Sequence, residues 1–153
     1  MNERSYKVFK IENGTVIDHI LSHMALKIID ILQIKEQGIV SIGINFDSKK
    51  CSKKDIIKIE NVYLQKKETD IIALISPEAT INIIKNSKVI EKRKIELPEQ
   101  IYGIMKCPNP MCVTNNYHDC DTNFSVKRYD EFYTVVRCFY CERESIVDPS
   151  IFK

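Results

Sequence analysis

Four cysteines near the end of the chain constrain its fold more than any other feature. Cys107 and Cys112 are separated by four residues, and Cys138 and Cys141 by two. Two tight loops of this kind can bring four sulfurs around one ion, which is the pattern of a tetrahedral structural zinc site. Buried free thiols or disulfides are the alternative. Because two short-spaced pairs in one small module are hard to produce by composition alone, the sequence predicts one zinc ion per chain.

Four thiolates would leave zinc no open coordination position for water, so the predicted site is structural rather than catalytic. His118 and Cys120 lie between the two pairs and could substitute as ligands, but neither belongs to a short-spaced pair. Cys51, which lies among lysines, is expected to be an incidental thiol. Unpaired thiols beside a zinc pattern are typical of a reducing compartment, so we expect a cytoplasmic protein. The chain begins without an apolar signal region and has no long apolar run, which predicts no membrane span.

The length of 153 residues allows two small domains. The segment 102–153 could not bury enough apolar surface alone, and zinc would supply the missing stability. Residues 1–97 are rich in Ile, Val and Leu and can form a separate α+β core. The sequence Leu97-Pro98-Glu99 is the expected linker between the two.

Periodicity in residues 1–97 predicts the element order β-α-β-β-α-β. Ser22 is the expected N-cap of the first helix and Gly38 marks the exit from it. This order is that of a ferredoxin-like antiparallel sheet with two helices on one face. A hairpin and a last short strand predict a small zinc-ribbon-like β domain at the end. The predicted strands are 6–11, 39–44, 55–64, 80–84, 89–92, 124–128, 132–137 and 146–147, and the predicted helices are 22–32 and 66–76. Segment 15–20 either continues the first strand or forms a loop beside it.

Charge and motif content separate the candidate functions. Residues 102–153 carry six Lys or Arg against seven Asp or Glu, and zinc with four thiolates would make that module more acidic. A zinc ribbon that binds nucleic acid should present a basic face to phosphates. A nucleic-acid-binding or transcription-type protein therefore remains the alternative and not the preferred reading. We expect no enzyme activity, because the sequence shows no nucleophile–base set and no Gly-rich phosphate loop.

Three strings and the cysteine set resemble the regulatory chain of aspartate carbamoyltransferase over essentially the whole chain. The strings are Asn13–Ile20 (NGTVIDHI), Lys54–Asn61 (KDIIKIEN) and Pro77–Asn82 (PEATIN). The resemblance implies a non-catalytic allosteric subunit in de novo pyrimidine biosynthesis. It implies that domain 1–97 binds nucleotide effectors, that domain 102–153 docks on a separate catalytic chain, and that regulatory chains pair into dimers. It implies neither nucleic acid nor membrane as a partner.

The resemblance also implies which residues surround a nucleoside triphosphate. Lysines would meet the phosphates, and Asp18 would accept hydrogen bonds from ribose hydroxyls. Without the resemblance, Lys54 and Lys58 would be ordinary solvated charges. The implied nucleotide-binding residues are Val8, Ile11, Asp18, His19, Lys54, Lys58, Thr80, Asn82, Ile84, Val89 and Lys92.

Three positions depart from the family pattern. Phe9 and Lys10 replace an acidic and a small residue, and Ser87 replaces an aromatic residue near the base. The preference between purine and pyrimidine bases is therefore not determined by the sequence. Nor are the identity of activating and inhibiting nucleotides, the binding of a second nucleotide with magnesium, and the stoichiometry of the assembly.

Overall fold

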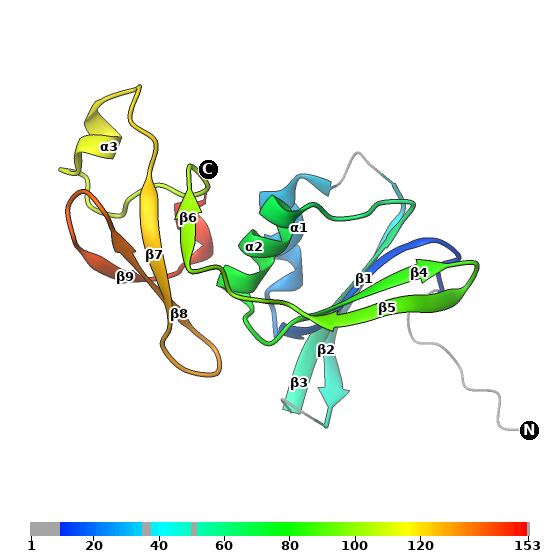
Figure 1. Ribbon diagram of the computed structural model, residues 1–153. Helices are drawn as coiled ribbons and strands as arrows, with labels where there is room; N and C mark the ends of the chain where they lie inside the picture. Colours follow the sequence, from blue (N-terminus) through cyan, green and yellow to red (C-terminus); the bar gives the residue numbers. More distant parts are fainter. Residues whose placement is uncertain (1–9, 35–37, 50–51, 153) are drawn as a thin grey trace, which may run out of the picture. The chain divides into compact units, whose positions relative to one another are not determined.

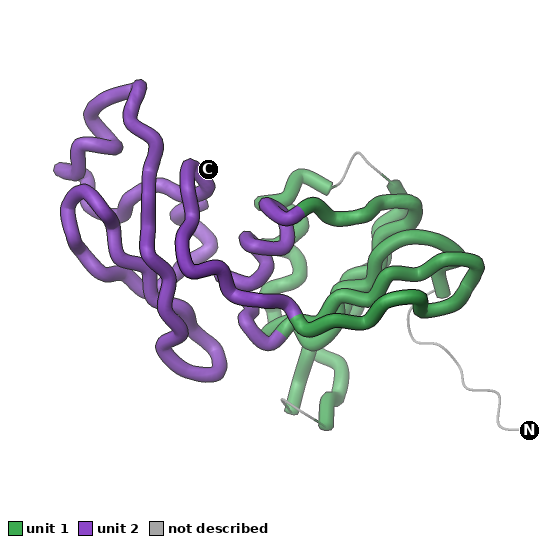
Figure 2. The backbone as a smooth tube through the Cα atoms, viewed as in Figure 1, with its two compact units in different colours: residues 1–65, 79–94 green, residues 66–78, 95–153 purple. Residues whose placement is uncertain are grey.

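The computed structural model describes residues 10–34, 38–49 and 52–152 (Figure 1). The chain divides into two compact units, which are described separately (Figure 2). The first unit comprises residues 1–65 and 79–94, and the second comprises residues 66–78 and 95–153. The predicted division into domains 1–97 and 102–153 is a different one and stays a prediction. None of the helices in the described ranges is long and apolar enough to cross a membrane.

A five-stranded antiparallel sheet forms the first unit, in the order β2-β3-β1-β4-β5 (Figure 1). The stretch β4-β1-β3-β2 is the ferredoxin-like order, and the predicted hairpin adds β5 at the edge. With helix α1 here and helix α2 (Lys66–Ile75) in the other unit, the chain has the predicted α+β fold of an antiparallel sheet with two helices. The elements are β1 (Gly14–Leu21), α1 (Ala25–Leu32), β2 (Val40–Ser48), β3 (Ser52–Glu60), β4 (Thr80–Lys85) and β5 (Lys88–Lys94).

Alternation along the central strands separates a core face from an open face. Ile17, Ile57 and Ile59 are completely buried, whereas their neighbours Val16 and Lys58 are half-buried. Successive side chains of a strand point to opposite faces, so the isoleucines lie on the core side of the sheet. Helix α1 adds its own apolar stripe of Ala25, Ile28, Ile29 and Leu32 to the core of the unit.

The predicted start of α1 is wrong. The helix begins at Ala25 with Met24 as its N-cap residue, and no side chain of that residue caps it. The buried carboxylate of Asp55 takes this role instead, because its Oδ2 accepts a hydrogen bond from the Ala25 N–H at 3.1 Å. A tertiary contact from β3 thus replaces the local cap that Ser22 would have supplied.

The predicted end of α1 at Leu32 is confirmed, and the left-handed backbone of Gln33 (φ 52°) follows it, so Gly38 does not mark the exit. Gly38 instead lies so close to the sheet that an added Cβ would be 2.4 Å from the carbonyl oxygen of Glu60. Several other boundaries differ from the prediction. Strand β3 ends at Glu60, and Lys10 and Ile11 are not in a strand. The rest of the predicted strand 6–11 lies outside the described residues.

The second unit contains α2, which ends just before Pro77 as predicted, and a four-stranded antiparallel sheet in the order β6-β7-β8-β9. The predicted hairpin is confirmed as β7–β8, and β9 is the last short strand. Ile101, Met105, Phe124 and Val136 form its buried apolar core. The elements are β6 (Gln100–Tyr102), α3 (Val113–Asn116), β7 (Asn123–Arg128), β8 (Thr134–Cys138), β9 (Glu144–Ile146) and the 3-10 helix Pro149–Ile151. This small sheet with four cysteines is the predicted zinc-ribbon-like fold.

Candidate functional site

The four cysteines of the two short-spaced pairs come together in the second unit. Their sulfur atoms all lie within 4.8 Å of one another. The Sγ atoms of Cys107 and Cys141 are 3.6 Å apart, and those of Cys112 and Cys138 are 3.8 Å apart. A zinc–sulfur bond of about 2.3 Å in tetrahedral geometry places neighbouring sulfurs about 3.8 Å apart. The cysteine cluster therefore has the dimensions of a four-thiolate zinc site.

Local backbone geometry explains how each loop presents its sulfurs. In the second loop, the left-handed backbone of Glu142 (φ 62°) follows Cys141 and turns the chain toward β9. The N–H groups of Tyr140 and Cys141 donate to the sulfur of Cys138. In the first loop, the N–H of Asn109 donates to the sulfur of Cys107. Such donors stabilise sulfur that carries negative charge, as it does in a thiolate ligand.

The thiols of the cluster have different proton affinities. Burial raises the pKa of Cys107. Burial also acts to raise the pKa of Cys141, but hydrogen bonds from the backbone of Arg143, the side chain of Asn109 and the thiol of Cys107 outweigh it and lower that pKa to about 6. The Thr114 hydroxyl donates to the sulfur of Cys112 at 3.2 Å. Neighbouring thiols thus share protons that a metal ion would displace.

Neither alternative ligand joins the cluster. His118 and Cys120 belong to the described residues, and the group of metal-ligating side chains found among these contains only Cys107, Cys112, Cys138 and Cys141. Cys51 lies outside the described residues. The set of donors, four sulfurs without a nitrogen or oxygen, is one that structural zinc sites use.

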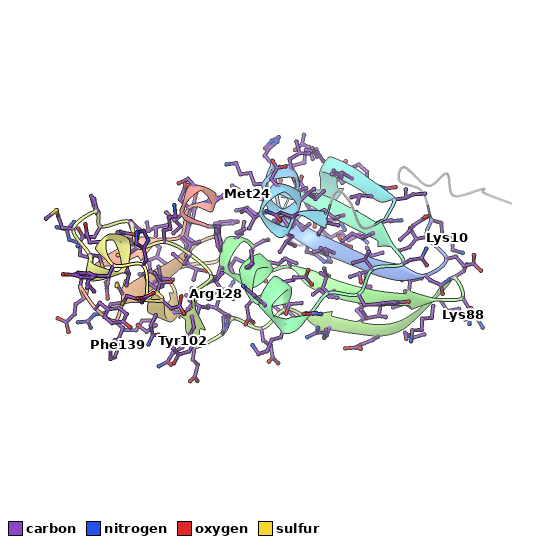
Figure 3. All side chains as sticks on the ribbon, turned by 90° about the horizontal axis from the view of Figure 1, so that it is seen from above. Lys10, Met24, Lys88, Tyr102, Arg128 and Phe139 are labelled. Atoms are coloured by element: carbon purple, nitrogen blue, oxygen red, sulfur yellow. The ribbon has the colours of Figure 1, made fainter. Side chains whose placement is uncertain are left out.

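A second candidate site lies in the first unit, on the open face of the five-stranded sheet. A pocket of about 290 Å³ opens there, with an apolar wall and polar groups at its edges. Its lining residues are Lys10, Ile11, Val16, Asp18, Ile56, Lys58, Asn82, Ile84, Ser87 and Val89. They come from β1, β3, β4 and β5, from the β4–β5 turn and from the segment before β1. Figure 3 shows Lys10 and Lys88 at the same end of this unit, near the β4–β5 turn.

Charged side chains form a connected cluster beside the pocket. The Lys54 ammonium lies 2.9 Å from Oδ1 of Asp18. The His19 ring nitrogen Nδ1 is 3.0 Å from the hydroxyl oxygen of Thr80. A bulge in β1 between Ile17 and Ile20 allows this arrangement, because it puts His19 in a left-handed conformation with φ 54°. The cluster positions a cation and an imidazole next to the Asp18 carboxylate that lines the pocket.

Two polar groups of the pocket, the Lys58 ammonium and the Asn82 amide oxygen, lose hydrogen bonds to water on burial without a full replacement. Burial lowers the pKa of Lys58, and the nearby Asp18 carboxylate partly offsets this effect. The Oδ1 atom of Asn82 is buried without a hydrogen-bond partner. An anion close to Lys58 and a donor close to Asn82 would each recover free energy that these groups lose on folding.

The structure brings most of the implied nucleotide-binding residues together. Ile11, Asp18, Lys58, Asn82, Ile84 and Val89 line the pocket. His19, Lys54 and Thr80 form the cluster at Asp18, and Lys92 lies opposite Asn82 in the β4–β5 pairing. Val8 lies outside the described residues.

Sequence reasoning missed two apolar lining residues, Val16 and Ile56. The signal for both was present. Each lies two residues before an implied binding residue on its strand, Asp18 or Lys58, and side chains two apart share a face of the sheet. Lys10 and Ser87, which the sequence marked as departures from the family pattern, also line the pocket.

The fold and the two candidate sites define a class of protein, an α+β domain with a pocket on its sheet joined to a small module with a closed four-cysteine cluster. Comparison with known families gives a specific match. The family model of the aspartate carbamoyltransferase regulatory chain, allosteric domain, matches residues 6–96. The model of the metal binding domain of the same chain matches residues 99–148.

Similar proteins with the same description come from several archaea. The aspartate carbamoyltransferase regulatory chain of Methanococcus maripaludis is 48% identical over 141 residues, which are 92% of this chain and 93% of the relative. That of Methanocaldococcus jannaschii is 47% identical over 137 residues, which are 90% of each chain. That of Pyrococcus horikoshii is 48% identical over 140 residues, again 90% of each chain.

This chain therefore belongs to the family of aspartate carbamoyltransferase regulatory chains, with an allosteric domain and a metal-binding domain. It is a regulatory and not a catalytic chain, which confirms the resemblance and the expectation of no enzyme activity. The family assignment also selects this reading over the nucleic-acid-binding alternative.

Proposed function

We propose that the chain binds nucleoside triphosphate effectors in the pocket on the open face of the five-stranded sheet. The observation that carries this proposal is the pocket lining, which combines an apolar wall with the cation of Lys58 and the unpartnered amide oxygen of Asn82. Ile11, Ile84 and Val89 suit the flat surface of a base. Asp18 suits ribose hydroxyls, because a carboxylate accepts hydrogen bonds.

The phosphates would be held by cations at the edge of the pocket. Lys54 and His19 are already positioned around Asp18 and Thr80. Lys92 is exposed on β5, opposite Asn82. A triphosphate carries several negative charges, and hydrogen bonds from ammonium and imidazolium groups to phosphate are among the strongest in proteins. These residues, those of the pocket and Val8 make up the nucleotide site that we propose.

The proposed role of the metal-binding domain is structural. One zinc ion would be held by Cys107, Cys112, Cys138 and Cys141, and its four thiolates would leave no open position for a reaction. The thiolates persist in a reducing compartment, so we place the protein in the cytoplasm. Magnesium would accompany the triphosphate of a bound nucleotide.

The zinc-supported domain would dock on the aspartate carbamoyltransferase catalytic chain, and regulatory chains would pair as dimers. Nucleotide binding would then shift a two-state equilibrium of the whole assembly and provide feedback regulation of pyrimidine synthesis. Such a shift requires that nucleotide binds the two states with different affinity. The family membership supports this role, since a regulatory chain acts on a catalytic partner.

Titration calorimetry of the assembly with ATP, CTP and UTP tests the proposal. We expect Lys58→Ala and Lys92→Ala each to weaken triphosphate binding by about 1.5–3 kcal/mol, the range for a hydrogen bond to a charged group. Lys66→Ala is the matched control. Lys66 lies on α2 with its side chain 81% exposed and paired with Asp70, so this variant loses the same charge at a residue that does not line the pocket. Unchanged affinity in both pocket variants would contradict the proposed site.

A further inference from the structure

Within the second unit, an ion pair joins two segments that are far apart in the sequence. The guanidinium of Arg128 contacts the carboxylate of Glu78. Glu78 belongs to the turn between α2 and β4, and Arg128 is the last residue of β7. Figure 3 labels Arg128. The two side chains are partly shielded, with exposed fractions of 40% for Arg128 and 24% for Glu78.

The β7–β8 turn holds the arginine in place for this contact. The Nε atom of Arg128 donates to the carbonyl oxygen of Asp130 at 3.0 Å, and Nη2 donates to that of Glu131 at 3.4 Å. The turn itself is closed by the Asp130 carboxylate, which accepts from the N–H groups of Phe132 and Tyr133, each at 2.8 Å. Because two carbonyl oxygens of the turn already hold the Arg128 guanidinium, the side chain loses little further conformational entropy when it contacts Glu78.

Each residue of the ion pair belongs to a segment of the chain that leads to one of the two candidate sites. Glu78 precedes Thr80 by two residues, and β4 then carries Asn82 and Ile84 into the sheet pocket. Strand β4 is hydrogen-bonded on both edges, to β1 and to β5, so it moves as a stiff element. At the other end, Arg128 is the register partner of Thr134 in β8, and that strand ends at Cys138 of the cysteine cluster.

We propose that the Glu78–Arg128 ion pair is a coupling latch, which transmits occupancy of the sheet pocket to the β7–β8 hairpin of the metal-binding domain. The proposal rests on the proposed nucleotide function, because it assigns how that function reaches the partner chain. A ligand that displaces β4 also displaces Glu78, and the ion pair is then either strained or released. Differential stability of the latch in the liganded and unliganded states is the coupling free energy.

The magnitude expected of the latch is modest. Ion pairs between partly exposed groups contribute at most about 1 kcal/mol, which is about fivefold in an equilibrium constant. That size is sufficient for regulation, since allosteric couplings lie in the range of about 5-fold to 150-fold. Loss of the ion pair should therefore reduce the response to nucleotide measurably, while it changes the free energy of unfolding little.

The test uses the assembly of this chain with its catalytic chain. Titration calorimetry measures nucleotide affinity, and steady-state rates measure the nucleotide-induced change in the half-saturating aspartate concentration. For Glu78→Gln we expect nucleotide affinity within twofold of the natural chain and zinc content unchanged, while the nucleotide-induced change falls by at least half. The charge-exchanged double variant, Glu78→Lys with Arg128→Glu, should restore at least half of the lost response.

Glu91→Gln is the matched control. It removes the carboxylate of another ion pair, that with Arg93 at 3.3 Å on the exposed strand β5, and should leave the response intact. A full response in Glu78→Gln, or an equal loss in Glu91→Gln, would overturn the latch. A loss of nucleotide affinity beyond twofold in Glu78→Gln would also overturn it, because Glu78 would then support the pocket itself.

The two proposals fail in different ways. If the natural assembly binds no nucleotide, the proposed function fails and the latch has nothing to transmit. If the natural assembly binds nucleotide and responds to it, but Glu78→Gln responds equally, only the latch is refuted.

Discussion

Asp55 offers the sharpest test of how the first unit is held together. Its side chain is completely buried, and each carboxylate oxygen accepts one backbone hydrogen bond. Oδ2 accepts from the Ala25 N–H at 3.1 Å, at the start of α1, and Oδ1 accepts from the Asn45 N–H at 3.0 Å, in β2. One side chain of β3 thus ties a helix and a neighbouring strand to the centre of the sheet.

Replacing Asp55 with Ala should destabilise the protein by about 3–5 kcal/mol. A hydrogen bond to a charged group contributes about 1.5–3 kcal/mol, and two are lost here while both N–H donors stay behind. Part of the cost is recovered if water enters the space that the carboxylate leaves. The carboxylate also faces the positive end of the α1 dipole, which adds a few tenths of a kcal/mol or more.

Urea unfolding of the zinc-loaded chain, followed by circular dichroism at the helix band, measures this cost. With a slope of about 1–3 kcal/mol per molar urea for a small protein, the midpoint should fall by at least about 1 M. Asp55→Asn keeps the size and one acceptor oxygen, and should lie between Asp55→Ala and the natural chain. Asp47→Ala is the control, because Asp47 is 85% exposed and pairs with Lys53 at the surface. If Asp55→Ala shifts the midpoint no more than Asp47→Ala does, the bridging role of Asp55 is refuted.

Three further outcomes can be measured directly. Elemental analysis should find about one zinc per chain, which Cys138→Ser loses and Cys120→Ser keeps; equal loss in both would contradict the ligand assignment. Removal of zinc by a chelator should unfold the metal-binding domain and release the chain from its catalytic partner. If the zinc-free chain still co-elutes with the catalytic chain on size exclusion, docking through this domain is refuted. Gly14→Ala should destabilise by more than about 2 kcal/mol, because Gly14 has φ 139° and an added Cβ would lie 2.0 Å from the Ile59 carbonyl oxygen. Gly103→Ala, where φ is 61° and the nearest atom to an added Cβ would be Oδ1 of Asp121 at 3.8 Å, should cost only about 1–2 kcal/mol.

Some properties of this protein follow from the sequence because they depend on local spacing. Two short cysteine pairs can close only around a small centre, so Cys107 and Cys141 meet although 33 residues separate them. The alternation of Ile57 and Ile59 with Lys58 and Glu60 likewise indicates which face of β3 is buried. The family strings indicated the sheet pocket, because three of its polar lining residues, Asp18, Lys58 and Asn82, occur within them.

Other properties were decided only by tertiary structure, because they depend on groups that are distant in sequence. Ser22 is a good local cap, but the helix starts three residues later because the Asp55 carboxylate from β3 satisfies its first N–H group. Glu78 and Arg128, fifty residues apart, form an ion pair that no local pattern encodes. Local spacing sets which residues can serve a site, and the three-dimensional fold determines which of them meet.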